Sequence, residues 1–167
     1  VLTESDITLS QASKKELYES IKNNTLRMER IINNLLDTAR LESGTMKIKN
    51  DWCDIQDIIG TALHRLEENL KDRSIALHIS DNLPLIRGDC VLLEQVLVNL
   101  IDNAGKYSAA DQTIEIKAEL SYDKLVVSVA DQGDNIPEAD KTKIFDKFYR
   151  GSRVRTIPGT GLGLFIC

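Results

Sequence analysis

The segment NLIDNAGKYS, residues 99–108, ends a strongly amphipathic predicted helix. Asn99 and Asn103 stand four residues apart, so a helix projects both amides from one face. Lys106 and Tyr107 follow one turn later on or near that face, off the apolar stripe. Amide oxygens, an ammonium group and a phenol on an exposed face suit a Mg²⁺–polyphosphate ligand, because Mg²⁺ takes few protein oxygens. An isolated N-x-x-x-N is more often an ordinary polar surface, so the segment alone leaves both interpretations open.

The residues around this helix have the pattern of an α/β domain. Apolar residues spaced three and four apart predict helices, and alternating apolar and polar residues predict strands. The predicted helices cover 13–42, 55–70 and 91–106, and the predicted strands cover 46–52, 74–80, 83–89, 113–120 and 124–131. A short turn near Tyr122 and Asp123 joins the last two strands, which predicts an antiparallel hairpin. We therefore expect an α/β sandwich with helices on one face of a mixed sheet, preceded by a long α-helix.

The helix predicted over 13–42 carries a continuous apolar stripe. The stripe includes Leu17, Ile21, Met28, Ile31, Ile32, Leu35, Leu36 and Ala39. Ser10 or Ser13 can cap the start of the helix, with Glu16 as a capping-box partner of Ser13, and Gly44 can end it. A single solvated helix would expose the whole stripe to water. The stripe therefore predicts pairing with other helices, in a hairpin or a dimer.

The composition is that of an ordinary globular protein, with 42% hydrophobic and 28% charged residues. A net charge of −5 argues against nucleic acid as a partner, since duplex binding depends on basic contacts to phosphates. Cys53, Cys90 and Cys167 are widely spaced, with no C-x-x-C pair and no companion histidine pattern, so we expect reduced thiols and no zinc site. No apolar run approaches the roughly 18 residues of a membrane span.

The segment DQGDNIP, residues 131–137, follows the last predicted strand. Asp131 can accept a hydrogen bond from an amino group such as that of adenine, and Gly133 lets the backbone approach a ligand. An ordinary strand-ending turn explains the segment equally well. Asn135 stands where a second glycine is expected in a nucleotide loop; it can adopt a positive φ, but its side chain would crowd the ligand.

The segment KIFDKFYRGSRVR, residues 143–155, places two aromatic residues ahead of three arginines. Phe145 and Phe148 can anchor a loop while an arginine such as Arg150 or Arg153 reaches a phosphate. A short helix that buries both rings and leaves the arginines solvated is an equally good interpretation.

The segment PGTGLGL, residues 158–164, has glycines at 159, 161 and 163 and opens a predicted helix. Backbone N–H groups at such a helix start form a phosphate cradle. The segment is neither a Walker A motif, because no Lys-Ser/Thr follows, nor a Rossmann fingerprint, because no strand precedes it.

In this order the four segments resemble the N, G1, F and G2 boxes of the ATP-binding domain of sensor histidine kinases. That domain has the GHKL or Bergerat-type fold shared with gyrase, Hsp90 and MutL. RIINNLLDTARLESG, residues 30–44, resembles the second dimerization helix that precedes this domain in such kinases. The sequences of the segments NLLDTARLESG, IFDKFYRG and PGTGLGLFIC are most similar to those of KdpD-type potassium/turgor sensor kinases.

The resemblance implies two parts and one reaction. Residues 1–44 correspond to the C-terminal part of a dimerization hairpin, and residues 45–167 correspond to the catalytic domain. The implied activity is transfer of the ATP γ-phosphoryl group to a histidine of the hairpin, then relay to an aspartate of a response regulator. The resemblance further implies a homodimer at the cytoplasmic face of the bacterial inner membrane in the full-length protein.

The resemblance also implies a role for each motif residue. Asn99 and Asn103 would hold Mg²⁺ and, with Lys106, form the catalytic set. Asp131 would recognise the adenine amino group, and Phe145 and Phe148 would anchor a lid over the nucleotide. The implied ATP contacts are Asn103, Lys106, Tyr107, Asp131, Gly133, Asn135, Ile136, Phe148, Arg150, Arg153, Gly159, Thr160, Gly161, Leu162 and Gly163.

Two departures from the family pattern are visible. The phosphoacceptor motif, a histidine followed by an acid and an R-T-P-like stretch, is absent, and neither His64 nor His78 lies in such a motif. We therefore expect the acceptor helix just upstream of Val1. This chain alone is expected not to autophosphorylate. The last helix and strand of the fold are expected after Cys167. The second departure is Asn135, which stands where the G1 box normally has its second glycine, and it motivates the alternative of a nucleotide-binding interaction module with impaired catalysis. A related ATPase or anti-sigma-type protein kinase is disfavoured, because those relatives lack the helix over 13–42.

Overall fold

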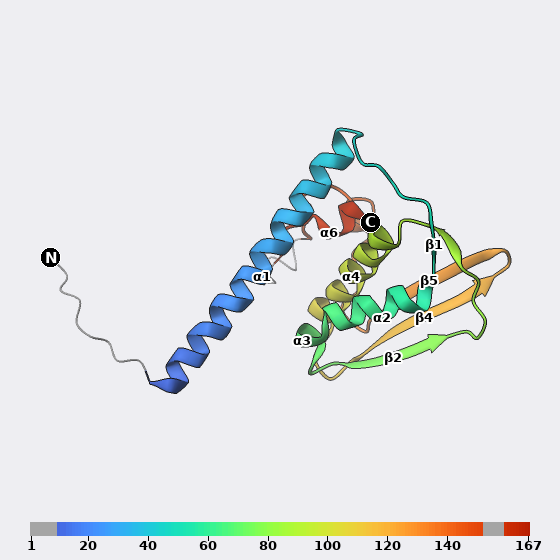
Figure 1. Ribbon diagram of the computed structural model, residues 1–167. Helices are drawn as coiled ribbons and strands as arrows, with labels where there is room; N and C mark the ends of the chain where they lie inside the picture. Colours follow the sequence, from blue (N-terminus) through green and yellow to red (C-terminus); the bar gives the residue numbers. More distant parts are fainter. Residues whose placement is uncertain (1–9, 152–158) are drawn as a thin grey trace.

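The computed structural model describes residues 10–151 and 159–167, and it shows a long helix beside an α/β domain (Figure 1). The helices are α1 (Gln11–Glu42), α2 (Ile55–Arg65), α3 (Glu67–Leu70), α4 (Cys90–Tyr107), α5 (Glu138–Lys141) and α6 (Gly163–Ile166). The strands are β1 (Asp51–Cys53), β2 (Ser74–Ile79), β3 (Ile86–Gly88), β4 (Thr113–Ser121) and β5 (Lys124–Ala130). The N-terminal end of α1 extends past the domain, while its C-terminal half lies beside α6.

The strands form one mixed sheet and one small antiparallel pair. β4 lies at the centre of the mixed sheet, parallel to β2 and antiparallel to β5. β1 pairs with β3 separately. The predicted hairpin is confirmed, since β4 and β5 are joined through Tyr122 and Asp123, with Tyr122 at a φ of 54°.

Alternation along β4 determines where the core lies. Ile114, Ile116 and Ala118 are buried, while Glu115 and Lys117 between them are exposed. α2 and α4 cover the buried face of the sheet (Figure 1). They contribute Ile55, Ile58, Ile59, Ala62, Leu97, Val98, Ile101 and Ala104 to the core. The predicted α/β sandwich, with helices on one face of a mixed sheet, is therefore confirmed.

Three predicted elements differ from the structure. The helix predicted over 55–70 breaks at Leu66, yet Leu66 and Leu70 are both buried, so the apolar periodicity continues across the break and does not reveal it. The strand predicted over 46–52 is confined to β1, because the Lys49 N–H donates to the Asp89 carboxylate (3.0 Å) instead of to a strand. The strand predicted over 83–89 is confined to β3, preceded by Pro84, which has no N–H to donate.

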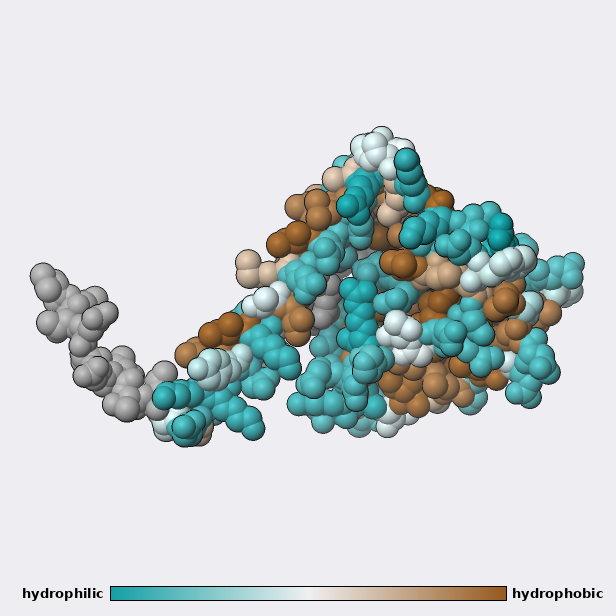
Figure 2. Space-filling view, viewed as in Figure 1, coloured by the Kyte–Doolittle hydropathy of each residue, from teal (hydrophilic) through white to brown (hydrophobic). Residues whose placement is uncertain are grey.

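The apolar stripe of α1 faces away from the α/β domain (Figure 2). Leu17, Ile21, Met28, Ile32 and Leu35 are exposed, whereas the side that meets the domain is polar and buries Asn34 and Thr38. Ser10 caps the helix by accepting from the Ser13 N–H, and Gly44 follows its end with a φ of 64°. None of the helices described is long and apolar enough to cross a membrane. The stripe is thus left available to another helix.

The prediction of separate, reduced thiols is wrong for Cys53 and Cys90, which form a disulfide. Cys53 ends β1, and β1 pairs with β3, whose last residue lies two positions before Cys90. This pairing brings the two Cα atoms to 5.6 Å, a separation that suits a disulfide. The proximity comes from strand pairing over 37 residues of sequence, so cysteine spacing could not reveal it.

Asp89 joins the segment that follows α1 to the start of α4. Its carboxylate accepts from the N–H groups of Val91 and Leu92 (both 3.2 Å) at the helix N-terminus, and from the N–H of Lys49. The bond from Lys49 is the largest influence that lowers the pKa of Asp89, and the two helix N–H groups act in the same direction. One carboxylate therefore fixes two parts of the chain.

We expect Asp89→Ala to lower the free energy of unfolding by about 1–2 kcal/mol at pH 7, the range for loss of a helix cap. Because the folded-state pKa of Asp89 is lowered, its stabilisation is present above the unfolded pKa of about 3.9 and is lost as the pH falls through the folded value. Urea unfolding of both proteins at pH 7 and pH 3 tests this, and the difference should shrink at pH 3. Asp54→Ala, which removes a single cap bond in α2, is the matched control with a smaller expected loss. A difference that grows on acidification would contradict the assignment.

Candidate nucleotide site

α4 positions one predicted site residue against the end of the chain. The Asn99 side chain is buried, with 7% of its surface exposed, and its Nδ2 donates to the Gly163 carbonyl oxygen at 3.1 Å. The prediction that Asn99 lies on an exposed helical face is therefore wrong, because α6 covers it. The bond uses the amide nitrogen and leaves Oδ1 as the atom available to a ligand.

The other three residues of the helix motif lie closer to the surface. Asn103 and Tyr107 are half-buried, and the Lys106 ammonium pairs with the Asp102 carboxylate. Asp102 also accepts from Asn69 Nδ2 at 3.3 Å. Asp102 was not among the predicted site residues, although its position four residues before Lys106 is a readable helical ion-pair spacing.

The turn after β5 packs against the last residues of α4. A Cβ on Gly133 would stand 2.3 Å from the Tyr107 carbonyl oxygen and 2.8 Å from Asp131 Oδ1. The Gly133 N–H donates to Asp131 Oδ1 at 2.8 Å, which orients an exposed carboxylate. Gly133 is therefore required by close contact with α4, in addition to any approach to a ligand.

Asn135 needs no unusual backbone conformation. The non-glycine residues with positive φ in the described chain are Asn82, Tyr122 and Phe148, so the tolerance of asparagine for a positive φ is not used at Asn135. The close approach of this turn to α4 is made at Gly133. The side chains of Asn135 and Ile136 are exposed.

The two ends of the predicted lid are joined at Gly161. The Phe148 N–H donates to the Gly161 carbonyl oxygen at 2.9 Å. Gly161 has a φ of 70°, and a Cβ there would stand 2.7 Å from backbone atoms of Phe148 and Tyr149. The next residue, Leu162, is buried, and its N–H donates to Thr160 Oγ1 at 3.4 Å.

Of the side chains predicted for the lid, Arg150 lies beside the glycine-rich segment, whereas the rings of Phe145 and Phe148 are exposed. Arg150 lies beside Gly159, with its Nε 4.0 Å from where a Cβ would stand, whereas Arg153 lies outside the described residues. The rings of Phe145 and Phe148 are exposed (56% and 57%), so they do not anchor the loop by burial. The loop is held instead by the backbone bond to Gly161 and by Tyr149, whose hydroxyl donates to Asp140 Oδ1 at 2.7 Å. That bond raises the pKa of Tyr149.

α1 reaches the same region through two contacts that the sequence did not predict. Lys147 Nζ lies 2.6 Å from Glu42 Oε1 at the end of α1. Gln95 Nε2 on α4 donates to Asn34 Oδ1 at 3.4 Å. Both pairs join residues more than 60 positions apart. The long helix therefore contacts both the site helix and the segment that begins the lid.

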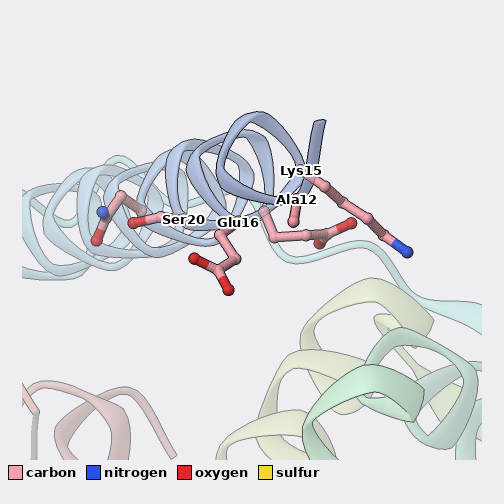
Figure 3. Close-up of a pocket in the computed structure, with 6 residues that line it drawn as sticks. Ala12, Lys15, Glu16 and Ser20 are labelled. Atoms are coloured by element: carbon pink, nitrogen blue, oxygen red, sulfur yellow. The ribbon is translucent and has the colours of Figure 1, made fainter. Parts of the chain in front are cut away.

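A shallow concavity near the start of α1 is a weaker candidate site. Figure 3 shows Ala12, Lys15, Glu16 and Ser20 along one helix, and every residue that lines the concavity belongs to α1. It contains none of the motif residues. The convergence of the four motifs around α4 is thus the better candidate.

Comparison with known proteins agrees with this arrangement. Residues 88–167 match the family described as histidine kinase-, DNA gyrase B-, and HSP90-like ATPase. The chain is 41% identical over 165 residues to the sensor protein KdpD of Escherichia coli K12, which covers 96% of this chain and 18% of that protein. The chain thus spans less than one-fifth of the length of this relative.

Solved structures of histidine kinases have the same fold. The catalytic domain of histidine kinase ThkA aligns with a TM-score of 0.62 and 30% identity, over 73% of this chain and 79% of that one. ThkA in complex with the response regulator protein TrrA aligns with a TM-score of 0.63 and 24% identity, over 85% of this chain and 42% of that one.

Full-length ShkA in complex with AMPPNP aligns with a TM-score of 0.74 and 23% identity, over 95% of this chain and 33% of that one. Its likeness covers α1 as well as the α/β domain, since nearly the whole chain is aligned. The family match, the KdpD relative and the ThkA domain agree with the motifs in their order along the chain. The chain therefore belongs to the histidine kinase-, DNA gyrase B-, and HSP90-like ATPases, and within them to the catalytic domains of sensor histidine kinases.

Proposed function

We propose that this chain binds Mg²⁺–ATP and transfers its γ-phosphoryl group to a histidine of a dimerization hairpin, for relay to an aspartate of a response regulator. The observation that carries the proposal is the convergence of the motifs on α4. Asn99 bonds to Gly163, and Gly133 packs on Tyr107. In the transfer, the bond from the γ-phosphorus to the bridging oxygen breaks, a phosphorus–nitrogen bond forms, and ADP leaves.

Several residues of the chain are arranged to hold the nucleotide. The Gly133 N–H fixes one oxygen of Asp131, which leaves the carboxylate oriented to accept from the adenine amino group. Lys106 and Arg150 supply positive charge for the phosphates, with Lys106 exchanging its Asp102 partner for a phosphate oxygen or bridging both. Catalysis of this kind consists mainly of positioning and charge neutralisation.

The residues of α4 fit a magnesium ion held largely by its ligand. Within residues 10–151 and 159–167 there is no group of three or more His, Cys, Asp or Glu side chains that could hold a metal. Asn99 and Asn103 offer amide oxygens one helical turn apart, and phosphate oxygens and water would complete the coordination. When bound, the ion neutralises charge on the triphosphate.

The acceptor and the partners come from outside the described chain. His64 and His78 are exposed and lie beside Glu67 and Glu115, on α2 and on the outer face of the sheet. Neither belongs to one of the motifs, so we propose that the acceptor histidine is supplied by another segment and that this chain alone does not autophosphorylate. The unpaired stripe of α1 suits a helical hairpin within a homodimer, with residues 1–44 forming its C-terminal part and 45–167 the catalytic domain.

The likeness to KdpD supports a more specific proposal for the location of the full-length protein and for the signal to which it responds. We propose that the full-length protein lies at the cytoplasmic face of the bacterial inner membrane and responds to potassium or turgor. A response regulator is the proposed next phosphate acceptor, as the ThkA–TrrA complex is an assembly of a kinase of this fold with such a protein.

We expect Asn103→Ala to remove most of the Mg²⁺-dependent affinity for ATP, because it deletes one of two amide oxygens. Calorimetry with a nonhydrolysable ATP analogue, with and without Mg²⁺, measures the effect. Loss of a group that only orients a metal ligand weakens metal binding roughly 10–100-fold, so loss of a direct ligand should weaken the Mg²⁺-dependent affinity by at least as much. Asn24→Ala, an exposed asparagine on α1, is the matched control and should bind as the wild type does. Equal affinity in the Asn103→Ala protein would refute the metal assignment, and a wild-type chain that does not bind the analogue would refute the proposed function.

A further inference from the structure

We infer that Arg73 is a positioning residue of the nucleotide site. It fixes the end of α4, and the turn that carries Asp131, the proposed adenine-binding residue, packs against that end. The inference depends on the proposed nucleotide binding and extends it to a residue that is far in sequence from the four motifs. Arg73 lies in the connection between α3 and β2 and has no proposed contact with the nucleotide.

The Arg73 guanidinium binds the carbonyl groups that end α4. One terminal nitrogen donates to the Ser108 carbonyl oxygen at 2.9 Å, to Ser108 Oγ at 3.2 Å and to the Ala109 carbonyl oxygen. The other donates to the Gly105 carbonyl oxygen. The last carbonyls of a helix lack intrahelical partners and carry partial negative charge, so a cation with several donors suits this position. The planar guanidinium meets these carbonyls with two nitrogens held in a rigid fork, whereas a lysine offers a single nitrogen on a flexible stem.

The guanidinium is itself held by tight packing of α3 against α4. The backbone N–H of Arg73 donates to the Leu70 carbonyl oxygen at 2.8 Å, and Leu70 is buried. A Cβ on Gly105 would stand 3.1 Å from Leu70 Cδ2, so the glycine allows this close approach. The end of α4 is therefore fixed against α3 by the contact with Leu70 and by the hydrogen bonds from Arg73.

This fixed segment is the surface on which the turn after β5 rests. Tyr107 lies between Gly105 and Ser108, and its carbonyl oxygen is the atom that a Cβ on Gly133 would approach to 2.3 Å. The Gly133 N–H in turn orients Asp131. A shift of residues 105–109 would therefore move the carboxylate proposed to read adenine.

The helix itself does not depend on Arg73. The Ser108 N–H and hydroxyl both donate to the Ala104 carbonyl oxygen, at 3.2 Å and 2.6 Å. These bonds continue to close the last turn if the guanidinium is removed. Loss of Arg73 should thus displace the end of α4 rather than unfold it, and the consequence should appear in adenine recognition.

The test compares ATP with ITP, which has the same phosphates but no amino group on the base. We expect Arg73→Ala to lower the affinity for ATP roughly tenfold, the loss of about one hydrogen bond to a charged acceptor, and to leave the affinity for ITP nearly unchanged. Arg73→Lys keeps the charge without the planar fork and should give a smaller loss. Arg87→Ala, an exposed arginine stacked on Trp52, is the matched control and should keep the ATP preference of the wild type.

A purely structural role would lower the unfolding midpoint without changing the ratio of ATP to ITP affinity in the folded protein. An unchanged ratio in Arg73→Ala overturns the inference, and if that variant does not fold, an unchanged ratio in Arg73→Lys does the same. A cycle with Asp131→Ala adds a second criterion: the double variant should bind ATP no more weakly than Asp131→Ala alone. Additive losses would overturn the action through Asp131. A wild-type chain that binds neither nucleotide refutes the proposed function and, with it, this inference.

Discussion

Replacing Gly161 by alanine is expected to weaken binding of a nonhydrolysable ATP analogue roughly 30- to 1000-fold. The residue has a φ of 70°, which costs a side chain about 1–2 kcal/mol. Its new Cβ would also stand 2.7 Å from the backbone of Phe148 and Tyr149, and such overpacking costs about 1–3 kcal/mol. If the conformation of the lid carries about 2–4 kcal/mol of this cost, the stated range of affinities follows. Calorimetry measures it.

The matched control for this variant is Gly44→Ala. Gly44 has a φ of 64°, but a Cβ there would meet no atom within 4 Å. It should therefore show the conformational cost alone, as a loss of about 1 kcal/mol of stability, with unchanged affinity for ATP. Wild-type affinity in Gly161→Ala would mean that the lid does not depend on the contact with Phe148.

Gly133→Ala is expected to weaken ATP binding roughly 10- to 100-fold while leaving the core folded. The added Cβ would stand 2.3 Å from the Tyr107 carbonyl oxygen, a backbone atom at the end of a helix that cannot move without disturbing α4. The turn must move instead, at a cost of about 1–3 kcal/mol, and Asp131 moves with it. The core should persist because Gly133 lies outside it.

Gly60→Ala provides the control for a glycine with open space. Gly60 lies in α2, and a Cβ there would meet nothing within 4 Å. The substitution should stabilise the protein by about 0.5–1 kcal/mol, because alanine is the better helix former, and should not change ATP affinity. Circular dichroism and calorimetry on both variants separate the outcomes: equal ATP affinity in Gly133→Ala and Gly60→Ala would contradict the proposed role of the turn.

Local patterns predicted the parts of the fold that local forces determine. β4 and β5 alternate and α4 is amphipathic, because each lies with one face on the core. The Cys53–Cys90 disulfide could not be predicted in this way, since it depends on β1 pairing with β3. The break at Leu66 was hidden for a different reason, namely that the buried stripe continues across it.

In the candidate site, too, some contacts were predictable from the sequence, whereas others depend on the packing of distant segments. The order of the four motifs predicted that they would gather, and the contacts of Asn99 with Gly163 and of Gly133 with Tyr107 agree with that. The burial of Asn99 was not predicted, because α6, which covers it, comes from a segment more than 60 residues away. Arg73 has no sequence signal at all, since its role depends on the packing of α3 against α4.

The ion pair between Glu42 and Lys147 joins the end of the long helix to the segment that begins the proposed lid. If ATP binding changes the free energy of that contact, then making or breaking the contact changes the affinity for ATP by the same factor. Under the proposed function, a displacement of α1 would then reach the nucleotide site through this contact. Conversely, occupancy of the nucleotide site would favour one position of α1 over another.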